Sequence, residues 1–322
     1  MKKSIPSAIT ILIPTVIISA ILGLVFGSVN VLEILKSDKE IALLILKNLR
    51  APRVLAALLC GMGLSVSGVL LQTVTGNPLA APNIIGVNSG AGFICIVMLT
   101  FFPELSSFLP LGAFLGAFLS ALIIILISGR INAFKGTVIL AGIAITALLN
   151  AGISLLSLLD SDVLSSYNAF SVGGVGGVTM SQLLLPAIII VSSFTLSLIL
   201  SRRIHTLCLG DSLSAAIGVR VRLLRTVCII CASASAAAVV SFAGLLGFVG
   251  LVVPHIARRI FGERTSVLLI SSALIGASLV ALADLFGRVL LAPTEIPVGI
   301  IMALIGAPFF FILLLKRRNE DA

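Results

Sequence analysis

The stretch VLAALLCGMGLSVSGVLLQTVTGNPLAAPNIIGVNSGAGFICIVMLTFFP, residues 54–103, contains no Asp, Glu, Lys or Arg. A membrane-spanning helix needs about 20 consecutive apolar residues, so this stretch is long enough for two. Near its middle lies QTVTGNPLAAPNIIGVNSGAG, from Gln72 to Gly92, whose Asn, Pro and Gly residues indicate where the first helix ends. The stretch therefore predicts two membrane helices joined by a tight turn.

The turn between these two helices carries no charge. No Lys or Arg stands beside its polar and bend-forming residues, which is unusual for a loop in water. Non-helical backbone is tolerated at membrane depth only where other helices cover it. We therefore expect a turn buried within the protein, with the following residues as its motif: Gln72, Asn77, Pro78, Pro82 and Gly86.

The composition of the whole chain is that of an integral membrane protein. Hydrophobic residues make up 59% of its 322 residues and charged residues only 10%, with a mean hydropathy of +1.27. Soluble domains carry about 25% charged residues. A net charge of +9 would suggest nucleic-acid binding in a soluble protein, but here the basic residues lie at the ends of apolar segments. We infer contact with membrane lipid and no binding of nucleic acid.

Apolar segments separated by charges or turns predict the membrane spans. Segment 226–254 lies between two basic clusters and is shorter than two full helices of about 20 residues each. Gly244, Gly247 and Gly250 predict a reversal inside it, with a full span ending near Phe242 and a half-length span ending at His255. The other predicted spans are residues 6–28, 54–74, 84–103, 109–128, 136–159, 181–201, 267–287 and 296–315.

The expected fold class is an all-α polytopic membrane protein with about ten helices, one of them short. Residues 1–322 would form a single transmembrane domain with both termini in the cytoplasm, next to Lys2 and Lys3 and to the basic residues 316–318. This orientation places most of the 21 Lys and Arg residues inside, as the positive-inside rule requires. The exceptions, which would lie outside, are Lys36, Lys39, Lys47, Arg50, Arg53 and Arg288.

Motifs for catalysis or metal binding do not stand out. The chain has no GxxxxGK[ST] loop, so it cannot bind ATP through a P-loop, and energy for transport would come from elsewhere. The cysteines lie in apolar segments without a His cluster or a second close pair, and we interpret them as small buried side chains. We expect no catalytic residue, no cofactor and no metal site. The cysteines are Cys60, Cys95, Cys208, Cys228 and Cys231.

Ionisable residues are rare within the predicted spans. Asp284 and Arg288 stand one helical turn apart near the outer end of span 267–287. Such a pair can neutralise itself, or Arg288 can face a partner, and the sequence favours neither alternative. RAPR, from Arg50 to Arg53, adds two more arginines on the expected outer side. They can anchor the helix at the membrane surface, or form with Arg288 a basic rim for the carboxylates of a soluble partner.

A second motif, LGDSLSAAIGV, lies in the basic loop at about residues 202–225. Asp211 is placed to cap a short helix, and Gly218 to end it. Leu213, Ala216 and Ile217 would form its apolar face, which can pack on the bundle, lie at the lipid interface or dock a partner.

Four motifs together resemble the FecCD family, the permease subunits of ABC importers for ferric siderophores, haem and cobalamin. They occur in order over nearly the whole chain, which makes the resemblance specific. One difference is Phe170 in FSVGGVGG, where related chains often have Trp before the glycines. The motifs are RAPRVLAALLCGMGLSVSGVLLQTVTGNPLAAPNIIGVNSGAG (50–92), LGDSLSAAIGV (209–219), GLLGFVGLVVPHIARR (244–259) and ADLFGRVLLAPTEIPVGIIMALIGAPFFFILL (283–314).

The resemblance implies a permease in a bacterial cytoplasmic (inner) membrane. Its partners would be a second permease subunit, identical or paralogous, two cytoplasmic ATPase subunits and an extracytoplasmic substrate-binding protein. Arg50, Arg53 and Arg288 would face glutamates of the binding protein. The turn motif would lie buried between the second and third spans. The residues expected to couple to the ATPase are Leu209, Gly210, Asp211, Leu213, Ala216, Ile217 and Gly218.

The expected function is therefore transport of a metal chelate, foremost a ferric siderophore, driven by ATP hydrolysis on partner subunits. Haem and cobalamin are alternatives within the family. An ion-coupled secondary transporter is the alternative from another class, and transport by the chain alone would identify it. A membrane-embedded enzyme is not supported, because the sequence shows no nucleophile, base or metal constellation.

Overall fold

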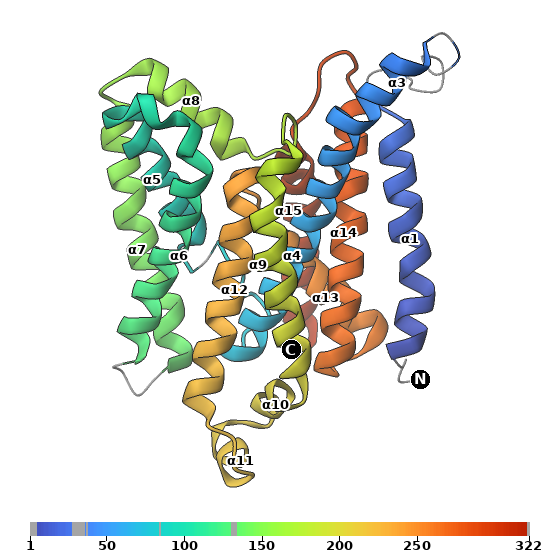
Figure 1. Ribbon diagram of the computed structural model, residues 1–322. Helices are drawn as coiled ribbons and strands as arrows, with labels where there is room; N and C mark the ends of the chain where they lie inside the picture. Colours follow the sequence, from blue (N-terminus) through green and yellow to red (C-terminus); the bar gives the residue numbers. More distant parts are fainter. Residues whose placement is uncertain (1–4, 28–35, 37, 84, 130–133, 321–322) are drawn as a thin grey trace.

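The computed structural model describes residues 5–27, 36, 38–83, 85–129 and 134–320, and every regular element in these ranges is helical. Most of the long helices stand side by side in one bundle (Figure 1). They are α1 (Ile5–Val25), α4 (Ala51–Thr75), α5 (Val87–Phe101), α6 (Leu109–Gly129), α7 (Phe134–Ser157), α9 (Met180–Ile199), α12 (Val221–Ala243), α14 (Thr265–Val289) and α15 (Val298–Glu320). The shorter elements are α3 (Lys39–Ile45), the π-helix η1 (Leu46–Arg50), the 3₁₀ helix η2 (Pro103–Phe108), α8 (Ser161–Val172), α10 (Ser201–Thr206), the 3₁₀ helix η3 (Leu207–Leu209), α11 (Asp211–Ala216) and α13 (Val249–Phe261).

Seven helices in the described ranges are long and apolar enough to cross a membrane, and α5 and α15 contribute shorter apolar segments. The expectation of an all-α polytopic membrane protein is confirmed at this level. Helix α4 continues from α3 and η1, so that its apolar segment runs from Lys39 to Thr75. It is also the most buried of these segments, because α9, α12, α13 and α14 all pack against it.

The predicted reversal after the full span is present. Helix α12 ends at Ala243, next to the predicted Phe242, and Gly244 and Phe248 adopt positive φ values of 68° and 65° in the turn that follows. The short helix α13 has 13 residues but ends at Phe261, so the predicted end at His255 is wrong. The helix continues because basic residues are favourable in a last turn, where Arg258 and Arg259 lie near the negative end of the helix dipole.

Glycine residues let α4 approach its neighbours without intervening side chains. A Cβ atom on Gly61 would collide with the backbone of Gly276 in α14, and one on Gly68 with the backbone of Gly250 in α13. Small residues at such crossings allow helices to pack backbone against backbone in a membrane. The centre of the bundle is therefore held at two levels by direct main-chain contact.

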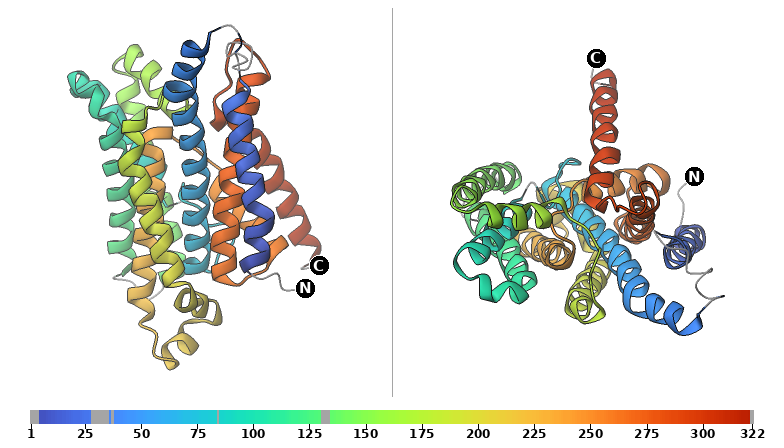
Figure 2. Two further views of the ribbon diagram at one scale, coloured as in Figure 1. Left: turned by 45° about the vertical axis from the view of Figure 1, so that its right-hand side comes forward. Right: turned by 90° about the horizontal axis from the view of Figure 1, so that it is seen from above.

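The two ends of the bundle differ in what they carry. Helices α3 and α8 lie at one end, here called the α8 end, and α10 and α11 at the other, the α11 end (Figure 1). The first turn of α1 and the last turn of α15 both lie towards the α11 end (Figure 2). Lys2 and Lys3, which the sequence assigns to the cytoplasm, lie outside the described residues.

Candidate functional site

An ion cluster at the α8 end joins α4 to α14. Arg53 donates from Nε and Nη2 to the carboxylate of Asp284 at 3.0 to 3.1 Å. The same carboxylate lies 3.1 Å from Nε of Arg288, one turn further along α14. Asp284 and Arg288 are both buried. The structure therefore shows the self-neutralising pair that the sequence left open, with Arg53 as a third member.

Glu295 is a member of this cluster that the sequence did not single out. It lies in the segment between α14 and α15, and its carboxylate accepts a hydrogen bond from Nη1 of Arg53 at 2.7 Å. Arg53, Asp284 and Glu295 face a pocket of about 320 Å³. Its other walls are Ala169, residues 173–176 and residues 296–298. A signal existed in the sequence, because Glu295 is the first acid after Asp284 and follows a Pro-containing turn.

Arg50 and Arg288 are held by backbone carbonyls in the last turn of α1 and directly after it. Arg288 donates from Nη1 to the carbonyl oxygens of Gly23 and Phe26 at 3.1 and 3.3 Å, and Arg50 donates to the same carbonyl of Phe26. Arg288 is 1% exposed. The structure thus brings together the three arginines expected at a docking rim, but only Arg53 keeps part of its side chain at the surface. The sequence did not predict the burial of the other two.

The turn after α4 is tied to α13 through Gln72. The Gln72 amide donates to the carbonyl of Gly250 at 3.3 Å, and its side-chain oxygen accepts from Nη2 of Arg258 at 3.0 Å. Gln72 is buried. Helix α4 ends at Thr75, and the next residue, Gly76, has a φ of 64°, in the left-handed region that glycine adopts most readily.

The rest of the turn satisfies its own backbone. Asn77 accepts from the backbone N–H of Leu79 through its side chain at 2.9 Å, while Pro78 is partly buried. Pro82 and Gly86 are buried, and the carbonyl of Gly86 accepts from the hydroxyl of Ser120 in α6 at 2.8 Å. Bonds of this kind replace the water that a membrane interior lacks.

The loop at the α11 end is held by hydrogen bonds of Ser214 and of the pair Asp211–Arg225, here called the polar frame. The N-cap of α11 is Gly210, so the expectation that Asp211 caps this helix is wrong. Asp211 instead uses both carboxylate oxygens to accept from Arg225 of α12, with one bond of 2.7 Å. Ser214 is buried and donates to the carbonyls of Thr206 and Gly210 at 2.7 Å. The guanidinium of Arg225 binds both carboxylate oxygens, so the Asp211 carboxylate does not accept hydrogen bonds from the backbone at the start of α11.

The frame leaves an apolar surface uncovered. Leu209, Leu213 and Ile217 are 60%, 57% and 61% exposed, and Ala216 lies beside them in the same exposed segment. Gly218, with φ of 83°, follows the helix and ends it as expected. A short helix and its flanking residues, with three large exposed apolar side chains at the basic end of the bundle, form a surface suited to a protein partner.

The cysteines divide into two groups. Cys60, Cys95, Cys228 and Cys231 are buried, as expected of small apolar side chains. Cys208 is exposed, so the expectation of burial is wrong for this residue. It lies in η3, between α10 and α11 and next to the exposed Leu209.

Comparison with known proteins identifies the family. The model of the FecCD transport family matches residues 11–316. Fe(3+)-citrate import system permease protein YfmE of Bacillus subtilis (strain 168) is 36% identical over 271 residues, covering 84% of this chain and 81% of the relative. Hemin transport system permease protein HmuU of Yersinia pestis is 36% identical over 279 residues, covering 85% and 84%. Iron(3+)-hydroxamate import system permease protein FhuG of B. subtilis (strain 168) is 36% identical over 284 residues, covering 85% and 84%.

The three-dimensional structure also has a solved counterpart. A chain described as an inward-facing conformation of a metal-chelate type ABC transporter superposes with a TM-score of 0.85 and 30% sequence identity. The match covers 97% of this chain and 99% of the other. The resemblance seen in the sequence motifs is confirmed: the chain belongs to the FecCD transport family, a family of ABC transporter permease subunits.

Proposed function

We propose that this chain is the transmembrane permease subunit of an ABC importer that moves a ferric siderophore across a bacterial cytoplasmic membrane. ATP hydrolysed by two partner subunits drives the transport. Relatives named for ferric citrate, ferric hydroxamate and hemin support a metal chelate as the substrate class. Haem and cobalamin are the alternatives within the family.

The proposed topology has about ten spans, formed by the nine long helices and the short α13. The α11 end is cytoplasmic and the α8 end faces outward. Support comes from the arginines at the α11 end, including Arg202, Arg203, Arg220 and Arg222, because basic residues gather on the cytoplasmic side. The positions of the first turn of α1 and the last turn of α15 at this end support cytoplasmic termini (Figure 2).

The observation that carries the proposal is the exposed apolar surface of the loop at about residues 202–225. Its three large side chains, Leu209, Leu213 and Ile217, point away from a frame held by Arg225 and Ser214. A rigid apolar surface of this kind suits a groove on a cytoplasmic protein. We assign it to the ATPase subunit, together with Gly210, Asp211, Ala216 and Gly218, which shape the loop.

We propose the α8 end as the docking surface for the substrate-binding protein. Arg53 has an exposed part and would meet a carboxylate of that protein. Arg50 and Arg288 would contribute their charge from buried positions near Arg53, where the carbonyls of Phe26 and Gly23 hold them. The five ionisable side chains Arg50, Arg53, Asp284, Arg288 and Glu295 keep one positive charge in excess.

A second permease subunit, identical or paralogous, would cover part of the apolar surface of α7 and α15. These helices expose large side chains over much of their length. Lipid would cover the remainder. The large exposed side chains are Leu140, Ile143, Leu148 and Leu155 on α7 and Ile300, Leu304, Ile305, Phe311, Ile312 and Leu315 on α15.

An ion-coupled secondary transporter would require an intramembrane acid that can bind and release a cation. Among the side chains that the structure describes in the long helices, Asp284 is the buried acid, and Arg53 and Arg288 bind its carboxylate. Such pairing opposes cation binding and favours a structural role for Asp284. The ion cluster therefore supports the ABC importer over the secondary transporter.

Reconstitution in proteoliposomes tests the proposal. The chain is assembled with an ATPase subunit and a substrate-binding protein from the same organism, and uptake of ferric siderophore, haem and cobalamin is compared with and without internal ATP. We expect ATP-dependent uptake of ferric siderophore. Uptake by the chain alone would replace the proposal with the secondary transporter, and a preference for haem or cobalamin would replace the substrate.

The variants Leu213→Asp and Ile217→Asp test the assigned surface. Each places a charge in the apolar contact with the ATPase and should abolish substrate-stimulated ATP hydrolysis while the chain still inserts. Ser212→Asp, at an exposed polar neighbour, is the matched control. Undiminished coupling in an inserted Leu213→Asp protein would remove α11 from the ATPase interface.

A further inference from the structure

A groove of about 460 Å³ opens on the side of the bundle between α1 and α9. Every residue of its lining is apolar, and α4 and α14 form its floor. Its volume lies within the range of roughly 300 to 1,000 Å³ that is typical of small-molecule sites. The lining residues are Ile9, Ile13 and Val16 of α1, Leu55, Leu58, Leu59 and Met62 of α4, Phe194 and Leu198 of α9, and Ile270, Ala273, Leu274 and Ala277 of α14.

The groove lies on helices that are long and apolar enough to span the membrane. Its lining is partly exposed, as at Ile13, which is 42% exposed, and partly buried, as at Leu59 and Ala273. A recess of this depth on a membrane-facing side cannot hold water favourably, because it offers no hydrogen-bond partner. An acyl chain matches its chemistry and can enter from the side.

The ends of the groove are unequal. Towards the α8 end, α4 and α3 slant outward between α9 and α1 and overhang the groove (Figure 2). Towards the α11 end, one flanking helix, α9, and one floor helix, α14, meet basic residues. Arg202 follows Leu198 by four residues, just past the end of α9, and Arg264 directly precedes α14.

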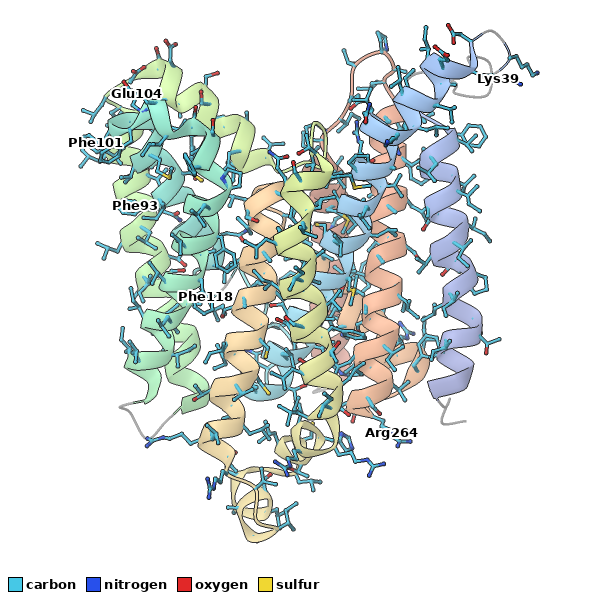
Figure 3. All side chains as sticks on the ribbon, viewed as in Figure 1. Lys39, Phe93, Phe101, Glu104, Phe118 and Arg264 are labelled. Carbon is cyan, nitrogen blue, oxygen red and sulfur yellow. The ribbon has the colours of Figure 1, made fainter. Side chains whose placement is uncertain are left out.

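Arg202 and Arg264 are both exposed at the α11 end. Arg264 lies at the foot of α14, opposite the end that carries Lys39 and Glu104 (Figure 3). The two segments are also tied to one another, because Nδ1 of His205 in α10 lies 3.1 Å from the hydroxyl oxygen of Thr265. Arg202 and Arg264 therefore place two exposed positive charges at the ends of two groove-lining helices, α9 and α14.

We propose that the groove binds one anionic phospholipid. Its acyl chain lies between α1 and α9 on the floor of α4 and α14, and its phosphate lies at Arg202 and Arg264. Because α4 and α3 cover the end of the groove towards the α8 end, the lipid enters from the α11 end. This end faces the inner leaflet in the orientation proposed above. The apolar lining selects the chain, and the arginines select the negative headgroup.

Photolabelling of the intact chain in nanodiscs tests the proposal. The probe is phosphatidylglycerol with a diazirine in its acyl chain, and phosphatidylcholine with the same chain is the comparison. We expect adducts from phosphatidylglycerol within residues 55–62, 194–198 and 270–277, and several-fold fewer from phosphatidylcholine. Replacing Arg202 and Arg264 by Gln should reduce phosphatidylglycerol labelling by about fivefold for each arginine at low salt. Labelling by phosphatidylcholine should stay the same.

A variant whose side chain fills the groove provides a second test by the same photolabelling measurement. Met62→Trp occupies the groove and should remove both labels, whereas Ile188→Trp, on the other exposed face of α9, should leave them intact. Circular dichroism and gel filtration confirm that each variant is folded before labelling. Three results would overturn the proposal: adducts spread evenly over both faces of α9, equal labelling by the two lipids, or unchanged labelling in a folded Met62→Trp protein.

Discussion

Arg258 donates a hydrogen bond to the side-chain oxygen of Gln72 over 3.0 Å, although the two residues are far apart in the chain. The bond joins the last turn of α4 to the last turn of α13, and the Gln72 amide reaches back to the carbonyl of Gly250 at the start of α13. One buried amide therefore holds both ends of the short helix against α4. The integrity of this contact can be measured directly.

Gln72→Leu should lower the free energy of unfolding by about 1 to 3 kcal/mol, because it leaves the Gly250 carbonyl and an Arg258 donor without this partner. Gln72→Glu keeps the acceptor for Arg258 and should lose less. The measurement is the thermal midpoint of the purified chain in detergent. Equal midpoints for the Leu and Glu variants would show that the bond to Arg258 contributes nothing.

Asp284→Asn should destabilise the bundle by roughly 3 to 5 kcal/mol, since it removes the negative partner of a buried arginine and leaves that charge uncompensated. Glu295→Gln is the matched control, because Glu295 is partly exposed and its pair with Arg53 should contribute no more than about 1 kcal/mol. Denaturant unfolding in detergent compares the two. A small effect of Asp284→Asn would mean that the cluster is hydrated.

Asp211→Asn should weaken coupling, because it loosens the tie between α11 and α12. The carboxylate is 52% exposed and accepts two bonds from Arg225, so its loss frees α11 but exposes little apolar surface. We expect a several-fold fall in substrate-stimulated ATP hydrolysis and a lower thermal midpoint, because the buried Arg225 loses its charged partner. Ser212→Asn is the control at the neighbouring exposed position. Full coupling in the Asp211→Asn protein would show that α11 needs no support from Arg225.

Glu295→Gln should strengthen docking of the binding protein, because Glu295 occupies Nη1 of Arg53 in the free chain. Arg50→Glu with Arg53→Glu should slow docking, and this effect should shrink as salt rises, since exposed charges are screened within about 10 Å at 0.1 M salt. Association rates from surface plasmon resonance measure both. If the double variant docks normally at low salt, the arginines anchor the helix and are not a docking surface.

Cys208 should react with an impermeant maleimide only from the cytoplasmic side of oriented vesicles. The native chain serves directly, because Cys208 is exposed whereas the other four cysteines are buried. Cys208→Ala is the control for background labelling. A single cysteine introduced at Gly247 in that background should react from the outer side only, if at all. The reverse pattern would invert the topology proposed here.

The spans could be predicted from the sequence because hydrophobic length and charge are local properties. The reversal after Ala243 could be predicted from glycines, but the end of α13 could not, because no glycine or proline stands between His255 and Gly262 to mark it. Contacts between segments that are far apart in the chain could not be predicted from the sequence. The pairing of Glu295 with Arg53, of Arg258 with Gln72 and of Arg225 with Asp211 depends on how helices are placed in space.

The burial of arginine side chains was also not predictable from the sequence. An arginine near a span end is normally expected to reach for water, yet Arg288 lies against the carbonyls of α1. The carbonyls are available because the last turn of α1 lacks the next residues of a helix to bond with them. Nothing in the residues around Arg288 indicates that α1 ends beside it.

The glycine contacts of α4 restrict how this permease can move. A shift of α4 along α14 by even one residue would bring the Cβ atom of Cys60 or Met62 towards the Gly276 backbone, where Gly61 now leaves no room. The same holds for Gly68 against α13. Helices α4, α13 and α14 are therefore expected to keep their positions relative to one another through the transport cycle. The parts that move are therefore expected among helices that contact their neighbours through side chains only.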